Sequence, residues 1–292
     1  MTAAAFNLNN RRGSSSVSSL WALFLLSLRQ HLHGKRWMVV SGLFLLPTVL
    51  AIIVRETNED MPTIVNEFLM AFMVIPQTLL PLGALIYASG IIQDELEEQT
   101  ITYPLMRPIP KWGLYLVKLA ATVITVSCLT AIFTTITYIA VYAGGDTPAR
   151  EVAERCAKAA GLHCLAAGTY CCLFALMSMV TKRALIAGIL YAAFVEGLLA
   201  NLPFSVRLLT VIYYSRLIAY RVLPFVVPDS FRNEDIAANA WQLDVRHDPD
   251  LSEHPAMGTC IIVLLTASAV CALLGAFICW KREFYVKTPE KS

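Results

Sequence analysis

The feature that most constrains this chain is a series of six apolar runs, each of a length suited to crossing a lipid bilayer. A helix rises about 1.5 Å per residue and the hydrocarbon layer is about 30 Å thick, so a spanning helix needs about 20 apolar residues. The runs cover residues 37–54, 64–92, 114–142, 159–180, 184–202 and 259–280. Hydrophobic residues make up 57% of the 292 residues and charged residues only 15%, whereas a soluble domain is about one quarter charged. The sequence therefore predicts an all-α polytopic membrane protein with six transmembrane helices.

The segments that flank these runs are polar or amphipathic. Residues 1–16 are polar and rich in serine, which predicts a disordered cytoplasmic N-terminus. Residues 17–33 repeat apolar side chains at helical spacing and predict an N-terminal helix lying at the inner membrane interface. An ordinary buried amphipathic helix explains the same pattern equally well. Residues 17–280 then form one transmembrane domain, and residues 281–292 form a cytoplasmic tail.

Lys and Arg are distributed unevenly between the loops, and this asymmetry predicts the orientation of the spans. With the N-terminus inside, most of the 23 Lys and Arg residues fall in inner segments, while the acidic residues gather in outer loops. Trp37, Trp112 and Trp280 fall at predicted inner boundaries, where amphipathic rings prefer to lie. We therefore expect a multi-pass protein with both termini in the cytoplasm.

Residues 203–256 are apolar in their first half but do not read as a seventh span. Arg207, Arg216 and Arg221 point to different faces of a helix there, and arginine at the bilayer centre costs at least about 2.5 kcal/mol on insertion scales. A seventh span would also place the tail outside. We expect instead an outer, re-entrant or interfacial helical segment between the last two spans.

A charged island at residues 91–118 separates the second and third runs. It carries the carboxylates Asp94, Glu95, Glu97 and Glu98, and then Thr100, Arg107 and Lys111. Prolines at positions 104, 108 and 110 stop a helix because each lacks a backbone donor and restricts the residue before it. The pattern predicts an acidic helical turn on the cytoplasmic side that can contact a soluble partner. The alternative is a solvated loop whose charges only keep it out of the lipid.

This island resembles the cytoplasmic signature of type-2 ATP-binding-cassette (ABC) transporter permeases. That signature is an acidic E-x-E-x-G-T turn, then L-L-x-R-P-[IV]-x-R, then a lysine that opens the next membrane helix. The matching residues here are Glu95, Glu97 or Glu98, Thr100, Leu105, Arg107, Pro108, Ile109, Lys111 and Lys118. Gln99 and Pro104 depart from it, standing where glycine and leucine are usual.

The resemblance implies a division of labour between subunits. In such permeases this loop is the coupling helix that docks on a separate P-loop ATPase, and short re-entrant helices lie between the last two spans. The chain would work as a pair of permeases, as a homodimer or heterodimer, in a bacterial plasma (inner) membrane. Asp94, Glu95, Glu97, Glu98, Thr100, Arg107 and Lys111 would form the ATPase-coupling site.

Motifs for chemistry within the chain itself are absent from the sequence. G-x-x-x-x-G-K-[ST], H-E-x-x-H and G-x-S-x-G do not occur, so we expect no enzymatic activity, no cofactor, and ATP bound only by the partner subunit. The basic residues form no cluster with interleaved aromatics, which argues against nucleic acid. His247, Asp248, Asp250 and His254 share a predicted outer loop, but sparse loop histidines are usually solvated, and we expect no metal.

Glu196 is a further candidate because it falls within the fifth run. A carboxylate in a membrane span is a functional candidate by default. It is interpreted as part of a substrate path or gate, or as an anchor that pairs with an arginine of the re-entrant segment. A hydrogen-bonded helix contact is the structural alternative.

We therefore expect the membrane subunit of an ABC transporter, an exporter, in contact with membrane lipid. The alternatives are an ion-coupled secondary transporter or channel, which needs charge partners within the membrane, and a membrane assembly factor without transport activity. The sequence does not name the cargo.

Overall fold

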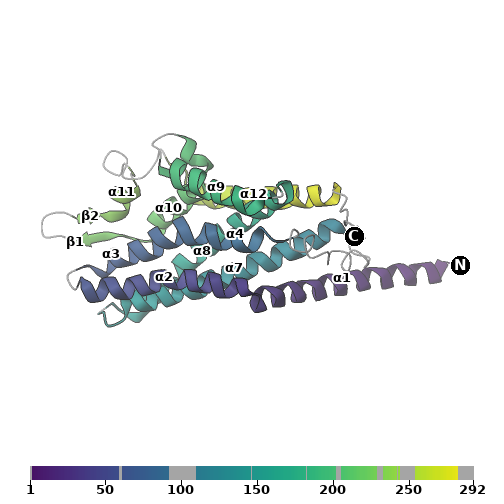
Figure 1. The fold of residues 1–292 in the computed structure, drawn as a ribbon, viewed down its shortest axis with the longest axis horizontal. Coiled ribbons are helices and arrows are strands. Elements are labelled where there is room, and N and C mark those ends of the chain that lie inside the picture. Colours follow the sequence, from purple (N-terminus) through teal and green to yellow (C-terminus); the bar gives the residue numbers. More distant parts are fainter. Residues whose placement is uncertain are drawn as a thin grey trace, which may run out of the picture.

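The computed structural model describes residues 2–58, 61–91, 110–145, 147–181, 183–201, 205–228, 233–241, 243 and 254–281. Six helical segments in these ranges are long and apolar enough to span a membrane, and they run side by side along the long axis of the molecule (Figure 1). They are α2 (Lys35–Thr57), α3–η1–α4 (Thr63–Ala88), α7 (Lys111–Tyr142), α8 (Ala149–Val180), α9–η2–η3 (Ala184–Asn201) and α12 (Met257–Lys281). The prediction of an all-α protein with six spans is confirmed.

The second span, α7 and α8 form the interior of the bundle. The buried core contains large side chains from each of them, such as Phe72, Tyr138 and Phe174. By contrast, α2, α9 and α12 carry many exposed large apolar side chains, including Val49, Ile189 and Leu273. A helix that is apolar all round and buried on one side only is typical of a membrane surface.

The second span departs from regular α-helix where its prolines predict an irregularity. It consists of α3 (Thr63–Glu67), the π-helix η1 (Phe68–Leu79) and α4 (Leu80–Ala88). Pro76 lies inside η1 and Pro81 in the first turn of α4. Proline lacks an N–H group and crowds the carbonyl four residues earlier. The wider π-helical turn absorbs this disruption and turns the preceding side chains relative to a straight α-helix.

The helix α8 begins at Ala149, ten residues before the apolar run at residues 159–180, so residues 149–158 are helical and not a loop. The buried stripe of α8 continues into this polar part, through Arg155 and Ala159. A hydropathy profile does not predict a charged residue on the buried face of a helix, because its burial is tolerated only when a partner elsewhere in the chain neutralises the charge.

The N-terminal helix α1 runs from Thr2 to His33, whereas the sequence predicts disorder over residues 1–16; no proline interrupts this stretch. Its last turns pack along α7, because Leu20 lies beside Gly113 and the His31 ring contacts Thr122. Figure 1 shows α1 following the long axis of the bundle rather than crossing it. Leu23 and Ser27 are buried against the bundle, whereas Trp21 and Leu25 are exposed, so this part of α1 is amphipathic and packs on the bundle through one face only.

Residues 205–228, 233–241 and 243, here called the capping segment, fold over one end of the bundle. They comprise η4 (Ser205–Leu209), α10 (Val211–Val222), β1 (Val226–Pro228), β2 (Asn233–Asp235) and α11 (Ile236–Trp241). The two short strands pair antiparallel, with Val226 opposite Asp235. The segment is not among the six candidate spans of the described chain, and α10 packs on α8 and α12.

Candidate functional site

Most of the predicted coupling residues lie outside the described residues. These are Asp94, Glu95, Glu97, Glu98, Thr100 and Arg107. The structure does describe both ends of their loop, at Ile91 and Pro110, and the first residue of α7, Lys111. We use the name hairpin for the predicted coupling loop at residues 92–109. The end of the bundle at Ile91 and Pro110 is called the hairpin end, and the opposite end, where Arg55 and Tyr142 lie, is called the far end.

Lys118 joins the two sides of the hairpin. Its Nζ atom donates a hydrogen bond of 3.2 Å to the backbone carbonyl of Ile91, and its side chain is buried. Ile91 closes the turn after α4, and helix C-terminal carbonyls attract cations because the helix dipole is negative there. Lys118, in the early part of α7, thus holds the two ends of the charged loop together. We call this contact the Lys118 clamp.

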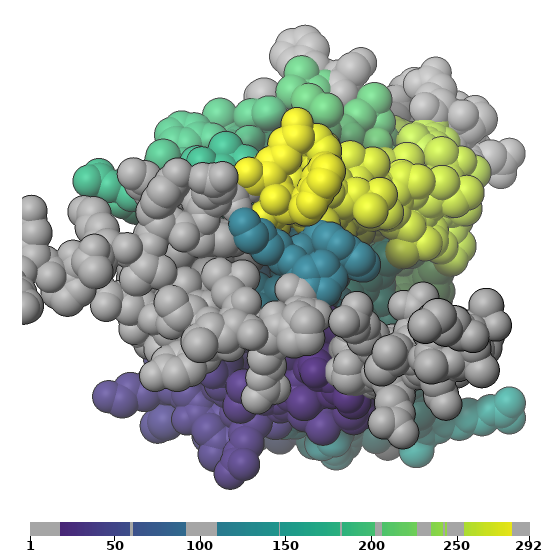
Figure 2. Space-filling model, turned by 90° about the vertical axis from the view of Figure 1, so that its right-hand side faces the viewer, coloured from purple at the N-terminus to yellow at the C-terminus, as the bar shows by residue number. Residues whose placement is uncertain are grey.

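The last turn of α12 supports the same end. The Cys279 thiol donates to the Lys111 carbonyl at 3.3 Å. A side chain at Gly275 would collide with the Tyr115 hydroxyl, so α12 and α7 approach closely here. Figure 2, which faces the hairpin end, shows the last turn of α12 in yellow directly beside the start of α7 in blue. The hairpin therefore emerges from a rigid base.

At the far end, a buried ion pair joins three spans. Arg155 of α8 donates from Nε and Nη2 to both carboxylate oxygens of Glu67, with distances from 2.8 to 3.1 Å. The hydroxyls of Tyr138 and Tyr142 on α7 donate to the same carboxylate at 2.7 and 2.6 Å. Glu67 is 0% and Arg155 6% exposed. Buried charges persist only when they are paired and hydrogen-bonded in this way.

The apolar runs of the sequence do not predict this cluster. Arg155 lies between the third and fourth runs, and Glu67 lies near the start of the second. The usable signal was helical spacing: Val152, Arg155, Ala159 and Leu162 recur at intervals of three and four residues, which places Arg155 on the buried face of an extended helix.

Glu196 is buried at 1% exposure in the π-helix η2 (Tyr191–Leu198). Its two oxygens accept the backbone N–H groups of Val211 and Ile212, each at 3.0 Å, and Oε1 also accepts the Tyr191 hydroxyl. A carboxylate at a helix N-terminus satisfies unpaired donors and complements the positive end of the dipole. Glu196 thus anchors α10 to the fifth span through hydrogen bonds to the backbone of α10, and the charge of Arg216 on α10 adds a longer-range attraction.

The neighbouring arginine of α10 has other partners. Arg216 is buried and donates from Nη1 to the Asn201 side-chain oxygen at 3.1 Å. Further along the capping segment, Tyr220 donates to Asp235 at 2.7 Å. Burial, together with this hydrogen bond, raises the pKa of Tyr220, so its hydroxyl remains a donor at neutral pH.

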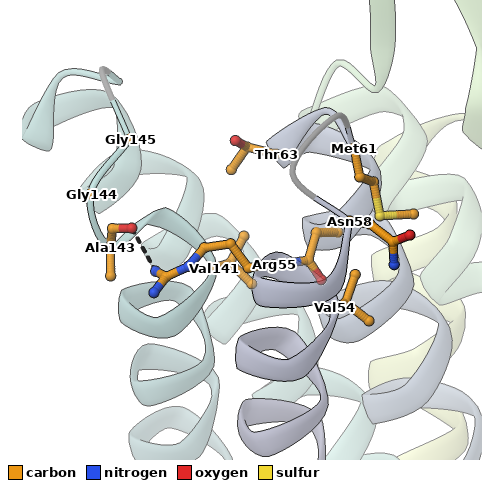
Figure 3. Close-up of a pocket in the computed structure, with 10 residues that line it drawn as sticks. Val54, Arg55, Asn58, Met61, Thr63, Val141, Ala143, Gly144 and Gly145 are labelled. Atoms are coloured by element: carbon orange, nitrogen blue, oxygen red, sulfur yellow. Dashed lines mark hydrogen bonds between the residues drawn. The ribbon is translucent and has the colours of Figure 1, made fainter.

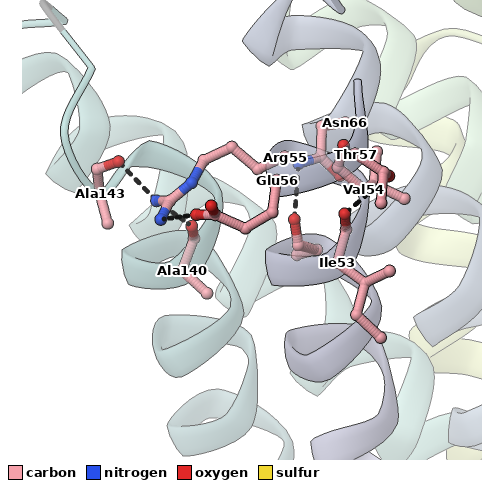
Figure 4. A network of polar contacts seen from close by, with 9 residues as sticks. Ile53, Val54, Arg55, Glu56, Thr57, Asn66, Ala140 and Ala143 are labelled. Carbon is pink, nitrogen blue, oxygen red and sulfur yellow. Dashed lines mark hydrogen bonds and ion pairs between the residues drawn. The ribbon is translucent and has the colours of Figure 1, made fainter. Parts of the chain in front are cut away.

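A small cavity of about 170 Å³ opens at the far end between α2, α3 and the end of α7 (Figure 3). Arg55 forms one wall and donates to the carbonyls of Ala143 and Ala140 at 2.6 and 3.4 Å, which ties α2 to α7. Figure 4 shows that the same guanidinium pairs with Glu56, at 3.2 Å. Arg55 is half-buried and Glu56 is exposed, and pairs at the surface contribute little stability.

Of the four outer-loop residues weighed as metal ligands, His247, Asp248 and Asp250 lie outside the described residues. His254 is described, and its Nδ1 atom is 2.9 Å from the Tyr213 hydroxyl. In the part of the chain that the structure covers, no group of three or more His, Cys, Asp or Glu side chains is arranged to hold a metal ion.

Comparison with known proteins identifies the family. Residues 32–196 match the family model described as "ABC-2 family transporter protein", which covers more than half of the chain. A comparison with curated proteins gave no match. The matched region includes the first four spans and the fifth as far as Glu196, together with the charged hairpin, Lys118 and the Glu67–Arg155 pair. The chain belongs to the ABC-2 transporter family and is a multi-pass membrane subunit of an ABC transporter.

Proposed function

We propose that the chain is the permease of an ABC exporter, driven by a separate P-loop ATPase that docks on the hairpin at residues 92–109. It resides in a bacterial plasma membrane with the hairpin end and both termini in the cytoplasm. ATP is bound by the partner alone, and this chain contributes the path for the cargo.

The observation that carries this proposal is the Lys118 clamp. A loop that transmits force must not slide relative to the helices that it moves. The hydrogen bond from Lys118 to the Ile91 carbonyl fixes the end of the second span against the third. Tyr87 of α4 and His31 of α1 are in edge-to-face contact beside the clamp, so α1 is attached to the same base. A push on the hairpin therefore moves these helices together.

The second span provides a route from the hairpin to the far end. It runs through the bundle interior from Ala88 to Thr63 and carries Glu67 near its far end. A rigid-body shift of such a packed helix is a common way of linking a nucleotide-driven step to a distant gate. Within the proposal, Glu67 is the point at which this shift reaches α7, α8 and the capping segment.

The exposed apolar faces of α2, α9 and α12 can contact either lipid or a second permease subunit. The second subunit would be an identical copy in a homodimer or a related chain in a heterodimer. An ion-coupled carrier would instead need an intramembrane charge open to its ion. Within the described residues, Glu67 and Arg155 satisfy each other and Glu196 is occupied by α10, which favours the ABC proposal.

The docking step is tested by charge reversal in the hairpin. Glu95→Lys together with Glu98→Lys should reduce the amount of ATPase subunit that co-purifies with the chain, because polar contacts across the interface become repulsive. Membrane insertion should be unchanged. The matched control is Glu151→Lys with Glu154→Lys, which reverses the same number of exposed charges at the far end of the bundle. Equal recovery of the ATPase with both double variants would overturn the docking site.

A further inference from the structure

We infer that the Glu67–Arg155 pair is a latch that holds part of the capping segment closed over the far end of the bundle. The latched part is residues 223–228, 233–241 and 243, which follow α10 and contain β1, β2 and α11. This is a property of the chain alone and does not depend on an ATPase.

Arg155 is the residue that links the ion pair to the capping segment. While Nε and Nη2 bind Glu67, Nη2 also donates to the backbone carbonyl of Pro224 at 3.1 Å. The guanidinium carbon lies 5.8 Å from the centroid of the Phe225 ring, over its face. One buried cation therefore contacts both the carboxylate of the second span and the first residues of the latched part.

Phe225 is the apolar counterpart of this contact. Its ring lies 5.3 Å from Phe68 and 5.0 Å from Phe72 of η1, centroid to centroid, and edge-on to both. Trp241 of α11 packs on Phe68 at 5.1 Å. The Phe225 carbonyl accepts the N–H of Ile236 at 3.2 Å. The ring of Phe225 thus packs in the bundle while its backbone carbonyl binds the start of α11. Release of Phe225 would therefore weaken the attachment of the strands and α11, leaving Trp241 on Phe68 as their remaining aromatic contact with the second span.

The capping segment has a second, independent anchor, and this creates a hinge. The start of α10 is fixed by Glu196, as described above, and α10 ends at Val222. Between the two anchors, Leu223 has left the helix and Pro224 follows. Loss of the Arg155 contact should therefore loosen residues 223–228 and 233–241 from the bundle while α10 remains bound, and the hydrogen bond from Tyr220 to Asp235 keeps β2 attached to α10.

The ion pair is suited to be a switch because its members sit on different spans. Glu67 belongs to α3 and Arg155 to α8, so a small shift between the two helices separates the charges. Separation leaves two buried charges without their counter-charges, which is costly, and a shift of α8 withdraws the guanidinium from Pro224. If the second span moves as in the proposed function, separation of the two charges would release the latched part. The latch itself does not depend on the proposed function.

The latch is tested by hydrogen exchange, measured by mass spectrometry on the purified chain in lipid nanodiscs without any ATPase. Arg155→Met removes the charge but keeps an apolar stem. The control Arg150→Met makes the same change one and a half turns earlier on α8, where the arginine is exposed. The reporters are peptides covering Phe225–Pro228 and Asn233–Trp241, compared with peptides from α7 and the apolar part of α8.

Exchange in the reporter peptides should rise by about tenfold or more in Arg155→Met, as expected for loss of a charge-assisted hydrogen bond and its packing. The α7 and α8 peptides should keep their protection, and Arg150→Met should match the wild-type chain. Unchanged exchange of the reporters, or an equal rise throughout the bundle, would overturn the latch. If Arg155→Met does not fold, Arg155→Lys decides: it keeps the charge but cannot reach Glu67 and Pro224 with a planar fork, so it should show the same local pattern at smaller amplitude.

Discussion

Glu196 offers a sharp test of whether a carboxylate inside a span serves the cargo or the fold. Its oxygens accept two backbone N–H groups of α10, and Thr210 accepts a third, from Tyr213. Together they satisfy the first three donors of the helix. Glu196→Ala leaves two buried N–H groups and the Tyr191 hydroxyl without an acceptor, and each such orphan costs about 1–3 kcal/mol. We expect a total loss of about 3 kcal/mol or more for Glu196→Ala.

Glu196→Gln should be milder than Glu196→Ala. Its amide oxygen can still accept one N–H, but its NH₂ group opposes the second, so we expect a loss of about 1–2 kcal/mol. Thr210→Ala, which removes only the N-cap, should cost about 1 kcal/mol. The expected order of stability is therefore wild type, then Thr210→Ala and Glu196→Gln, then Glu196→Ala.

A thiol-reactive fluorophore is a suitable assay because the chain supplies its own reporters. Cys128 is exposed and reacts with the folded chain, whereas the thiols of Cys171, Cys172, Cys260 and Cys279 are buried and add to the signal only when the bundle opens on heating. The melting temperature of the purified chain should fall most for Glu196→Ala. A Glu196→Ala chain that melts with the wild type would refute the anchor, and would favour a role for Glu196 in the substrate path or gate.

Two further predictions concern the hairpin end. Lys118→Met should weaken stimulation of the ATPase while leaving assembly intact, because the two ends of the hairpin are no longer clamped. The control is Lys158→Met, which removes an exposed lysine at the far end. Equal stimulation by both variants would contradict the clamp. Gly275→Leu should destabilise the chain by about 1–3 kcal/mol in the thiol-reactivity melt, because its side chain collides with Tyr115. Gly258→Leu, at a position with open space on the same helix, should be neutral, and a similar loss in both would contradict the close packing.

The spans were predictable from the sequence because lipid imposes a simple rule on a helix. Long apolar runs gave the six spans, and arginines kept residues 203–256 from being read as a seventh. The hairpin motif gave the family. These features depend only on local composition and spacing.

The polar anchors were not predictable in the same way. Arg155 is acceptable in a buried helix only because Glu67, 88 residues away, neutralises it. Glu196 could be recognised as unusual, but its partners are backbone N–H groups, which leave no trace in the sequence. The π-helix around Pro76 follows from proline in general, but whether the chain bends or widens there depends on the packing around it.

The central claim is that this permease is worked through its hairpin, and ATP hydrolysis tests it most directly. The rate of the partner ATPase should be measured alone, with the wild-type chain, and with the chain that carries Glu95→Lys and Glu98→Lys, all in lipid. The account predicts that the wild-type chain stimulates hydrolysis and that the charge-reversed chain leaves the rate at the level of the ATPase alone. Full stimulation by the charge-reversed chain would contradict it.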